Sequence, residues 1–445
     1  MIKLKLILPI VAQLVTAQYL FSQGAGIETP EPMLRAGVCR INITPPLTIP
    51  LGGYTNRTGP ATGIRDSLYA TAIVFDDGET KAAIVTLDII QAKYKEGQQI
   101  YRAIESEADI AESNVIINAS HTHGSPWLET DSYFKEEVIK EVAKAVKTAS
   151  LSLDTISVGY GEGEVGFNVS RRKITGSGQY ITALNPDGLT DHRVKVLRVD
   201  CINVPYTPKA IIFHVVCHPN VFRWKNTRVT ADFPGEAKSF IEKNFSDGTT
   251  ALFLQGCAGD IRANLPEEGK GPDESSFGRN GDEADMRWCG WSAGAEVVKI
   301  SVWLGVKEQI QQRREINKVC TVSGLIKVSA KEKEGNVLWP REHIVNGKAH
   351  LPVKMISIGK ICFVALPGEP VVEYGFIIEE QLQSLGFNHV FVMGYSDGDA
   401  GYIPTKKMFS EGGYEVTESA LLPSCEKEII KGIKRLAKDL IKQAG

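Results

Sequence analysis

A run of apolar residues that ends in two closely spaced histidines constrains the fold more than any other feature of this sequence. Residues 114–119 read Asn-Val-Ile-Ile-Asn-Ala, an apolar run of strand length, and residues 120–126 read Ser-His-Thr-His-Gly-Ser-Pro. Side chains at positions i and i+2 of a strand face the same side, so we expect His121 and His123 to emerge together at a strand end. Two neutral imidazoles on one face are typical of a zinc site, although two hydrogen-bonded histidines in a loop are the alternative.

The composition is that of a globular protein with a large buried core. The 445 residues are 43% hydrophobic and 23% charged, which is ordinary for such proteins. The formal net charge is −3, and because no basic tract stands out we expect no nucleic-acid partner.

The first residues are typical of a secretory signal peptide. Residues 1–24 combine a short positively charged start, a mostly apolar stretch and small polar residues, which is the pattern of a cleaved signal rather than of a membrane-spanning helix. No later stretch approaches the length of a membrane span. We therefore expect an exported protein, either periplasmic or secreted, without a membrane span.

Strand and helix signals alternate along the rest of the chain. Alternation of apolar and polar residues predicts strands, and amphipathic spacing predicts helices. The expected strands are residues 36–43, 67–75, 81–88, 114–119, 156–161, 194–199, 210–216, 251–255 and 389–393, with a hairpin at 353–358 and 361–366. The expected helices are residues 94–108, 133–150, 293–311, 373–385 and 427–443, with another starting near Asp232 and a surface loop at 267–287. This order predicts an α/β fold in which mixed β-sheets are flanked by α-helices.

Two further strands end in side chains that can bind a metal ion. The strand at 210–216 runs into His218 and a proline. His214 lies on the same side of this strand, and we favour His218 as a ligand and His214 as a buried or supporting residue. The strand at 361–366 stops at Pro-Gly-Glu-Pro, which suggests that Glu369 is a fixed acid at a strand end.

Polar loops supply candidate substrate contacts. The Gly/Asp-rich loop at 394–405 carries two tyrosines, and residues 412–415 repeat this pattern; such loops bind ligands more often than they act as spacers. Arg171 and Arg172 follow a Gly-Phe-Asn turn, where they can bind an anion or a polar substrate. A solvated loop is the alternative for these two arginines.

These motifs, in this order, resemble those of the neutral/alkaline non-lysosomal ceramidase family. The resemblance covers about residues 36–420, nearly the whole mature chain. The motifs that carry it are Ser-His-Thr-His at 120–123, His-Pro at 218–219, Ala-Asp-Phe-Pro-Gly at 231–235, Gly-Asp at 259–260, Pro-Gly-Glu at 367–369, Gly-Tyr-Ile-Pro-Thr at 401–405 and Gly-Tyr-Glu at 413–415. The resemblance implies that residues 30–445 form a ceramidase-like catalytic domain.

The resemblance also implies a single zinc ion held by two histidines, one glutamate and one tyrosine. Matched motif by motif, these ligands are His121, His218, Glu369 and Tyr402. Three further residues would line the site, namely His123, Arg171 and Tyr414. Arg171 lies near the substrate-binding arginine of the family, and Tyr414 matches a second active-site tyrosine.

The sequence departs from the family in two respects. Ceramidases carry a serine, regarded as essential for amide cleavage, within a Gly-Asp-Val-Ser-Pro-Asn segment. Residues 259–264 read Gly-Asp-Ile-Arg-Ala-Asn, so Arg262 stands where that serine would be. Ceramidases also have a C-terminal β-sandwich domain, and we expect this sequence to end about where the catalytic domain ends. Both departures argue against ceramide as the substrate, while the ligand set is complete.

The expected activity is metal-assisted hydrolysis of an amide, ester or lactone. A catalytic zinc ion lowers the pKa of its water to about 7, and a water activated in this way needs no serine. Tyr402 can ligate weakly or donate a hydrogen bond to an oxyanion. His123 and Asp260 are the candidates for proton transfer, and Tyr414 is the further candidate catalytic residue.

Arg262 is the main indication of specificity. A guanidinium group in the pocket suits a carboxylate, sulfate or phosphate of the substrate, and Trp127 and Trp224 can offer stacking faces. We therefore expect a small polar, acidic or glycan-derived substrate. The alternatives are that Arg262 pairs with Asp260 and that the tryptophans belong to the core. Two other functions stay open, a true ceramidase acting on a lipid and a non-catalytic binding protein on the same scaffold.

Overall fold

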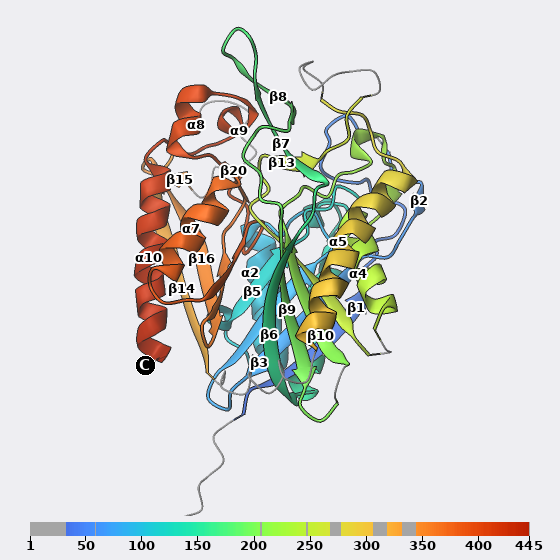
Figure 1. Ribbon diagram of the computed structural model, residues 1–445, viewed down its shortest axis with the longest axis vertical. Helices are drawn as coiled ribbons and strands as arrows, with labels where there is room; N and C mark the ends of the chain where they lie inside the picture. Colours follow the sequence, from blue (N-terminus) through green and yellow to red (C-terminus); the bar gives the residue numbers. More distant parts are fainter. Residues whose placement is uncertain are drawn as a thin grey trace, which may run out of the picture. The chain divides into compact units, whose positions relative to one another are not determined.

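Two mixed β-sheets pack face to face at the centre of the fold (Figure 1). In spatial order, the eight strands of the larger sheet are β12 (Thr250–Gln255), β10 (Pro208–Val215), β9 (Arg193–Cys201), β6 (Asp154–Glu164), β1 (Arg35–Asn42), β3 (Tyr69–Asp76), β4 (Lys81–Leu87) and β5 (Val115–Ala119). The smaller sheet consists of β14 (Val319–Ser329), β16 (Lys348–Ile358), β17 (Ile361–Ala365) and β19 (His389–Met393), with β15 (Ile344–Val345) paired to β16.

The computed structural model describes residues 33–57, 59–204, 207–245, 248–267, 277–305, 318–331 and 344–444. From Leu34 onward the chain forms one compact unit. The predicted signal peptide, residues 1–24, lies outside the described residues. Among the helices that are described, none combines the length and the apolar character needed to cross a membrane.

Helices cover the outer faces of both sheets, so the fold has four layers. The larger sheet is covered by α2 (Tyr94–Ala108), α3 (Ser132–Leu151), α4 (Asp232–Lys243) and α5 (Glu283–Leu304). The smaller sheet is covered by α7 (Glu373–Gln383) and α10 (Cys425–Ala444). Figure 1 shows α7 and α10 on one side of the sheets and α4 and α5 on the other. The predicted α/β class, with mixed sheets between helices, is confirmed.

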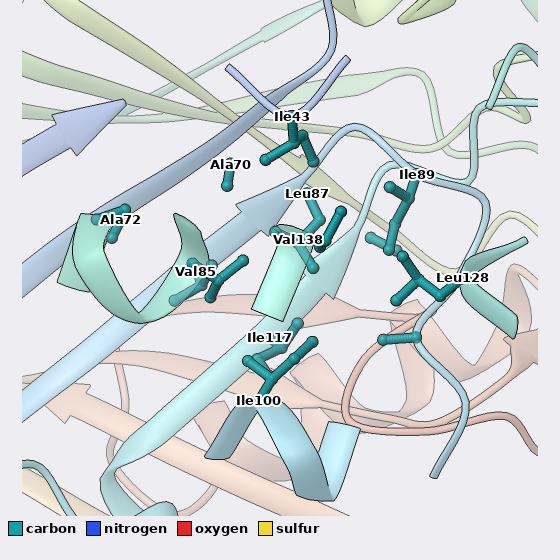
Figure 2. Packing of buried hydrophobic residues seen from close by; sticks show 14 of the residues in the cluster. Ile43, Ala70, Ala72, Val85, Leu87, Ile89, Ile100, Ile117, Leu128 and Val138 are labelled. Atoms are coloured by element: carbon teal, nitrogen blue, oxygen red, sulfur yellow. The ribbon is translucent and has the colours of Figure 1, made fainter. Parts of the chain in front are cut away.

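The alternation of side chains along the strands builds these layers. In β4, Val85 and Leu87 pack toward α2 and α3, whereas Ala82 and Ile84 pack toward the smaller sheet. Figure 2 shows Val138 of α3 between Val85 and Leu87, and Ile100 of α2 beside Ile117 of β5. Full burial of each such valine, leucine or isoleucine contributes about 1.5–3 kcal/mol, so a strand that is apolar on both faces stabilises both interfaces.

Three parallel strand pairs bring several strand ends to one edge. β4 and β5 are joined through α2, β10 and β12 through α4, and β17 and β19 through α7, and each pair is parallel. In parallel pairs the carboxyl ends of both strands lie at the same edge, which is where ligands bind in open α/β sheets. Bridges from Asn118 to Ser396 and from Gly256 to Met393 join these ends across the two sheets.

Short elements complete the structure around this edge. The short strands are β2 (Gly63–Ile64) paired with β11 (Arg228–Val229), β7 (Asn168–Ile174) between β8 (Tyr180–Asn185) and β13 (Ile261–Ala263), and β18 (Glu369–Pro370) paired with β20 (Tyr402–Ile403). The short helices are α8 (Lys406–Glu411), α9 (Tyr414–Thr417) and the 3₁₀ turns η1 (Glu112–Asn114), η2 (Leu128–Thr130) and η3 (Arg223–Lys225).

Two local predictions need correction. The loop expected at 267–287 ends early, because α5 begins at Glu283 behind a capping box formed by Asp282 and Asp285. This capping box satisfies backbone donors at the helix start, and the predicted start at residue 293 was too late. Residues 171–172, read as part of a turn or a solvated loop, lie instead in β7 and are buried.

Candidate metal centre

Three histidines reach one point from the ends of two strands of the larger sheet. His121 and His123 follow β5, and His218 follows β10. Their ligand atoms lie within 4.8 Å of one another, and all three residues are buried, so the group could hold a metal ion. β5 ends before the two neighbouring histidines. They are brought together by a left-handed turn at His121, with φ of 64°, and not by the alternation of side chains along a strand. Such a backbone conformation is unfavourable by about 1–3 kcal/mol.

Hydrogen bonds fix two of the imidazole rings. The Nδ1 atom of His121 lies 2.8 Å from the carbonyl oxygen of Ile90, and Nδ1 of His218 lies 2.7 Å from that of Ala258. A carbonyl oxygen only accepts, so each Nδ1 carries a proton, and the neutral form of each ring has its lone pair on Nε2. Burial lowers the pKa of His121 to about 4, so its ring is neutral at pH 7.

Both lone pairs face the carboxylate of Glu369. Its Oε2 atom lies 3.5 Å from Nε2 of His121 and 3.1 Å from Nε2 of His218. Burial raises the pKa of Glu369, but its interactions with the two histidines outweigh that effect and lower the pKa to about 2. Two imidazole nitrogens that both lie within 3.5 Å of one carboxylate oxygen form a donor set that fits a bound metal ion.

His123 differs from the other two histidines. Both of its ring nitrogens are buried, and neither has a hydrogen-bond partner among the described residues. Burial holds its pKa well below the usual value, so the ring is neutral. Gly53 lies against this ring, and a Cβ atom there would come within 2.3 Å of Nδ1. Two donor sets are therefore present, one with three histidines and one with His121, His218 and Glu369.

Tyr402 stands next to Glu369 because β18 and β20 are paired. The two residues are direct partners in this parallel pair, and the backbone nitrogen of Glu369 donates to the carbonyl of Gly401 at 2.8 Å. Burial and the charge of Glu369 hold the pKa of Tyr402 well above its usual range. The ring of Tyr414 meets that of Tyr402 edge to face, with centroids 5.4 Å apart.

Arg171 connects these tyrosines to a buried carboxylate. Its Nε donates to Glu415 at 3.0 Å, and its guanidinium carbon lies 5.4 Å from the ring centroids of both Tyr402 and Tyr414. Arg172 binds the other oxygen of Glu415 at 2.7 Å. The Nη2 atom of Arg171 has no partner among the described residues, so this group is free to bind a ligand.

The histidines open into a cavity of about 750 Å³. Nine of the ten predicted site residues line it, namely His121, His123, Trp127, Arg171, His218, Arg262, Glu369, Tyr402 and Tyr414. Segments that are far apart in the sequence therefore form one wall, as a catalytic or binding site requires.

Asp260 is the predicted site residue that does not line the cavity. Its Oδ1 atom accepts a hydrogen bond from the backbone of Val372, and its carbonyl accepts one from the backbone of Arg171. Gly259 lies against the carbonyl of Glu369, where a Cβ atom would come within 2.5 Å. The glycines of this segment allow close packing behind the site rather than contact with a ligand. Trp224 also lies outside the cavity wall and is 46% exposed.

Sequence reasoning missed several residues that line the cavity or contact the metal-binding side chains. Tyr395 donates to Oε2 of Glu369 at 3.4 Å, and its ring lies 4.3 Å from that of His121. Tyr54 and Arg223 line the cavity, as does Arg57, whose guanidinium binds the carbonyls of Gly52, His123 and Arg223. Tyr395 lies in the loop predicted to bind ligands, whereas no sequence signal marks the arginines.

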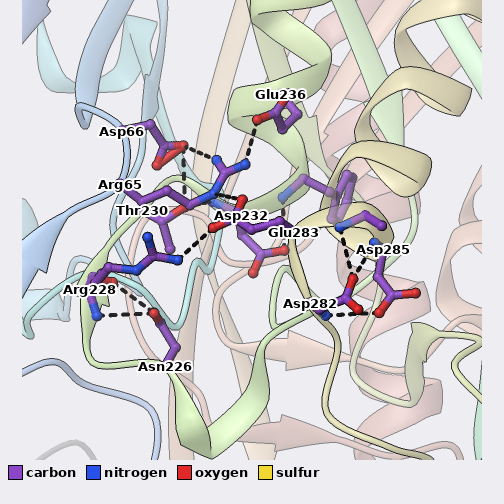
Figure 3. A network of polar contacts seen from close by, with 12 residues as sticks. Arg65, Asp66, Asn226, Arg228, Thr230, Asp232, Glu236, Asp282, Glu283 and Asp285 are labelled. Carbon is purple, nitrogen blue, oxygen red and sulfur yellow. Dashed lines mark hydrogen bonds and ion pairs between the residues drawn. The ribbon is translucent and has the colours of Figure 1, made fainter.

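A network of charged side chains holds one wall of the cavity from outside (Figure 3). Arg65 donates to Glu236 of α4 at 2.6 Å and to Glu283 of α5 at 2.8 Å. Arg65 follows the pairing of β2 with β11. These contacts fasten the segment before residue 66, which carries Tyr54 and Arg57, to the two helices.

Comparison with known proteins agrees with this geometry. A family model described as neutral/alkaline non-lysosomal ceramidase, N-terminal, matches residues 34–276. The crystal structure of neutral ceramidase from Pseudomonas aeruginosa aligns with a TM-score of 0.75 and 18% identity over 92% of this chain and 75% of the other. A structure of a ceramidase complexed with C2 gives a TM-score of 0.76 and 18% identity, over 92% and 76% of the chains. The chain belongs to the neutral/alkaline non-lysosomal ceramidase family.

Proposed function

We propose that this protein is an exported zinc-dependent hydrolase that cleaves an amide, ester or lactone. The observation that carries the proposal is the approach of Nε2 of both His121 and His218 to one oxygen of Glu369, at 3.5 and 3.1 Å. In tetrahedral zinc sites, bond lengths of about 2.0–2.1 Å separate neighbouring ligand atoms by roughly 3.3 Å. The spacing and the mixture of two imidazoles with one carboxylate suit catalytic zinc.

His121, His218 and Glu369 would hold the ion, and Tyr402 is the fourth candidate ligand. A zinc ion bound there would act as a Lewis acid and would lower the pKa of a coordinated water to about 7. Tyr402 stays protonated at pH 7, because burial and Glu369 raise its pKa, and it can donate a hydrogen bond to an oxyanion. His123, neutral and without a partner, can accept a proton or orient the substrate. Asp260 as a proton-transfer group stays a prediction, and its contacts favour a role in holding Arg171 in place.

The substrate that we propose is a small polar, acidic or glycan-derived molecule. Polar side chains make up much of the cavity wall, and Trp127 can stack on a sugar ring. A second candidate is a true ceramidase that acts on a lipid amide, which the family membership favours. The wall also has apolar residues that could receive an acyl chain, namely Leu51, Ile90 and Phe277.

The test begins with elemental analysis of the purified protein by mass spectrometry. We expect about one zinc ion per chain, with hydrolysis that is lost after chelation and recovered when zinc is added. A panel of amides, esters and lactones, with a fluorescent short-chain ceramide alongside, then separates the two candidates. Turnover of ceramide at rates well above the polar substrates would favour the lipid amidase. A chain that binds no divalent metal and hydrolyses nothing in the panel would support the binding-protein alternative.

A further inference from the structure

Among the described residues, the charged groups that line the cavity do not balance. Four arginines line it, whereas the carboxylates in its wall are Glu369 and Glu418. Glu369 already faces two histidines, and a metal ion bound there would add positive charge. The four arginines are Arg57, Arg171, Arg223 and Arg262.

Three of these arginines have protein partners that hold them in place. Arg57 binds three carbonyl oxygens, and Arg171 binds the buried carboxylate of Glu415. Arg223 is held in place by the carbonyls of Phe277 and Gly278. These contacts fix the positions of the three side chains, but carbonyl groups do not neutralise the charge of Arg57 or Arg223.

Arg262 has no such contacts. It lies in β13, opposite Val169 of β7, and is only 6% exposed. Within the described part of the chain, its Nε atom has no hydrogen-bond partner and no carboxylate forms an ion pair with it. In particular, the carboxylate of Asp260 accepts from the backbone of Val372 instead.

The surroundings of Arg262 increase this imbalance. Burial and then the like charge of Arg223 lower the pKa of Arg262 to about 9, so the side chain is still charged at pH 7. A phenolate at Tyr54 would offset the charge of Arg262, but burial raises the pKa of Tyr54 and keeps it neutral. A buried charge without a partner is unfavourable, and in a cavity wall a ligand can supply that partner.

We propose that Arg262, supported by Arg223, binds an anionic group of the substrate, namely a carboxylate, sulfate or phosphate. The planar guanidinium group binds such oxyanions through two parallel hydrogen bonds. Both arginines line the cavity that contains the histidines and Glu369, so the anionic group would be held while the scissile bond lies at the metal centre. This inference rests on the proposed function for its account of the substrate, but the anion site itself is testable without turnover.

The first experiment measures thermal stabilisation of the metal-loaded protein by sodium sulfate, with sodium chloride at equal ionic strength as the reference. A ligand that binds the folded state raises the melting temperature in a saturable manner. We expect saturable stabilisation of the wild type, and at least about tenfold weaker apparent affinity in Arg262→Met, with partial recovery in Arg262→Lys. The matched control is Arg287→Met on the exposed side of α5, which should behave as the wild type.

The result cannot be confused with a folding defect, because Arg262→Met removes an unpaired buried charge. Without sulfate we expect the variant to melt at the same temperature as the wild type or higher, and at saturating sulfate the order should reverse. Equal sulfate responses in wild type and Arg262→Met would overturn the proposal, as would a wild type without any saturable response.

Two further arms separate this inference from the proposed function. Glu369→Gln should lose hydrolysis but keep the sulfate response. A sulfate response that is lost in Glu369→Gln and kept in Arg262→Met would place the anion at the metal and overturn the proposal.

The second arm compares 4-nitrophenyl hemisuccinate with the neutral 4-nitrophenyl butyrate. We expect Arg262→Met to lower the ratio of their kcat/KM values at least about tenfold. An unchanged ratio would show that the anion site does not select the substrate.

Discussion

Two parts of the same cavity wall differ in whether their charged side chains face a partner of the opposite charge. In the metal cluster, which we define as His121, His218 and Glu369, each imidazole is anchored by a backbone carbonyl and directed at one carboxylate oxygen. In the arginine pair, which we define as Arg223 and Arg262, no carboxylate of the described residues forms an ion pair with the buried side chain of Arg262. The first region groups ligand atoms that suit a cation, and the second presents a positive charge that suits an anion.

This contrast separates a feature of the family from a feature of this chain. The His-x-His, His-Pro and Pro-Gly-Glu motifs that form the metal cluster are those by which the sequence resembles ceramidases. Arg262 lies where the resemblance breaks down. A shared reaction centre beside a distinct recognition group is what we expect when related enzymes act on different substrates.

The largest expected effect tests the metal cluster. Glu369→Gln removes the negative charge that draws a cation between the two histidines. We expect loss of bound zinc and a decrease in kcat/KM of at least about 1,000-fold, about 4 kcal/mol, because a metal supplies several kcal/mol of transition-state stabilisation. Zinc content and kinetics measure it, with Glu418→Gln as the control carboxylate of the same cavity. Full zinc content in Glu369→Gln and loss of zinc in His123→Ala would instead favour the three-histidine set.

The next effect compares two buried arginines. Arg198 is 1% exposed and forms an ion pair with Asp200 at 2.7 Å, whereas Arg262 has no carboxylate partner among the described residues. We expect Arg198→Met to lower the free energy of unfolding by about 3 kcal/mol, because it removes the cation of a buried ion pair. Arg262→Met should leave the free energy of unfolding unchanged or raise it. Urea unfolding in chloride buffer measures both, and equal destabilisation would contradict the contrast.

A smaller effect concerns how firmly the metal cluster is held. Tyr395 donates to Glu369 and lies against the ring of His121. Removal of its hydroxyl group in Tyr395→Phe should weaken zinc binding about tenfold, as is usual for groups that orient metal ligands. Competition with a chromophoric chelator measures the affinity. The control is Tyr374→Phe, which removes a hydroxyl group that donates to the carbonyl of Pro404 in the core around the smaller sheet. This variant should retain the wild-type affinity for zinc.

The smallest effect concerns pH. Burial raises the pKa of Glu415, but Arg171 and Arg172 outweigh burial and hold the pKa below its usual value. The folded state then binds fewer protons than the unfolded state, so the contribution to stability is present above about pH 4.3 and is lost as pH falls through the folded pKa. Denaturant unfolding of wild type and Glu415→Gln between pH 3 and 7 should show curves that converge in acid. A difference that stays constant across this range would exclude the ionised carboxylate as its cause.

Local patterns in the sequence predicted much of the fold. The continuous apolar run of β4, which is buried on both faces, and the amphipathic spacing of α3 are set by which faces are buried. The histidines and Glu369 were recognisable because metal-binding side chains directly follow apolar strands. The family resemblance then supplied Tyr402, whose partnership with Glu369 depends on a pairing of two-residue strands that no local pattern announces.

The parts that sequence reasoning missed depend on contacts between distant segments. Arg57 reaches the carbonyl of Arg223 across 166 positions of the chain, and an arginine in a glycine-rich loop gives no sign of that. Asp260 was proposed as a proton-transfer residue, and this role stays a prediction. Its carboxylate accepts a hydrogen bond from the backbone of Val372, a direction that depends on packing and not on spacing.

The origin of the metal cluster has a consequence for the mechanics of the whole protein. Both histidines follow strands of the larger sheet, whereas Glu369 follows β17 of the smaller one. An ion held among them would link the two sheets across the interface where they pack. Without the ion, one sheet could shift more easily relative to the other. Chelation should therefore increase the rate of amide hydrogen exchange along the interface between the sheets, well beyond the residues that contact the ion.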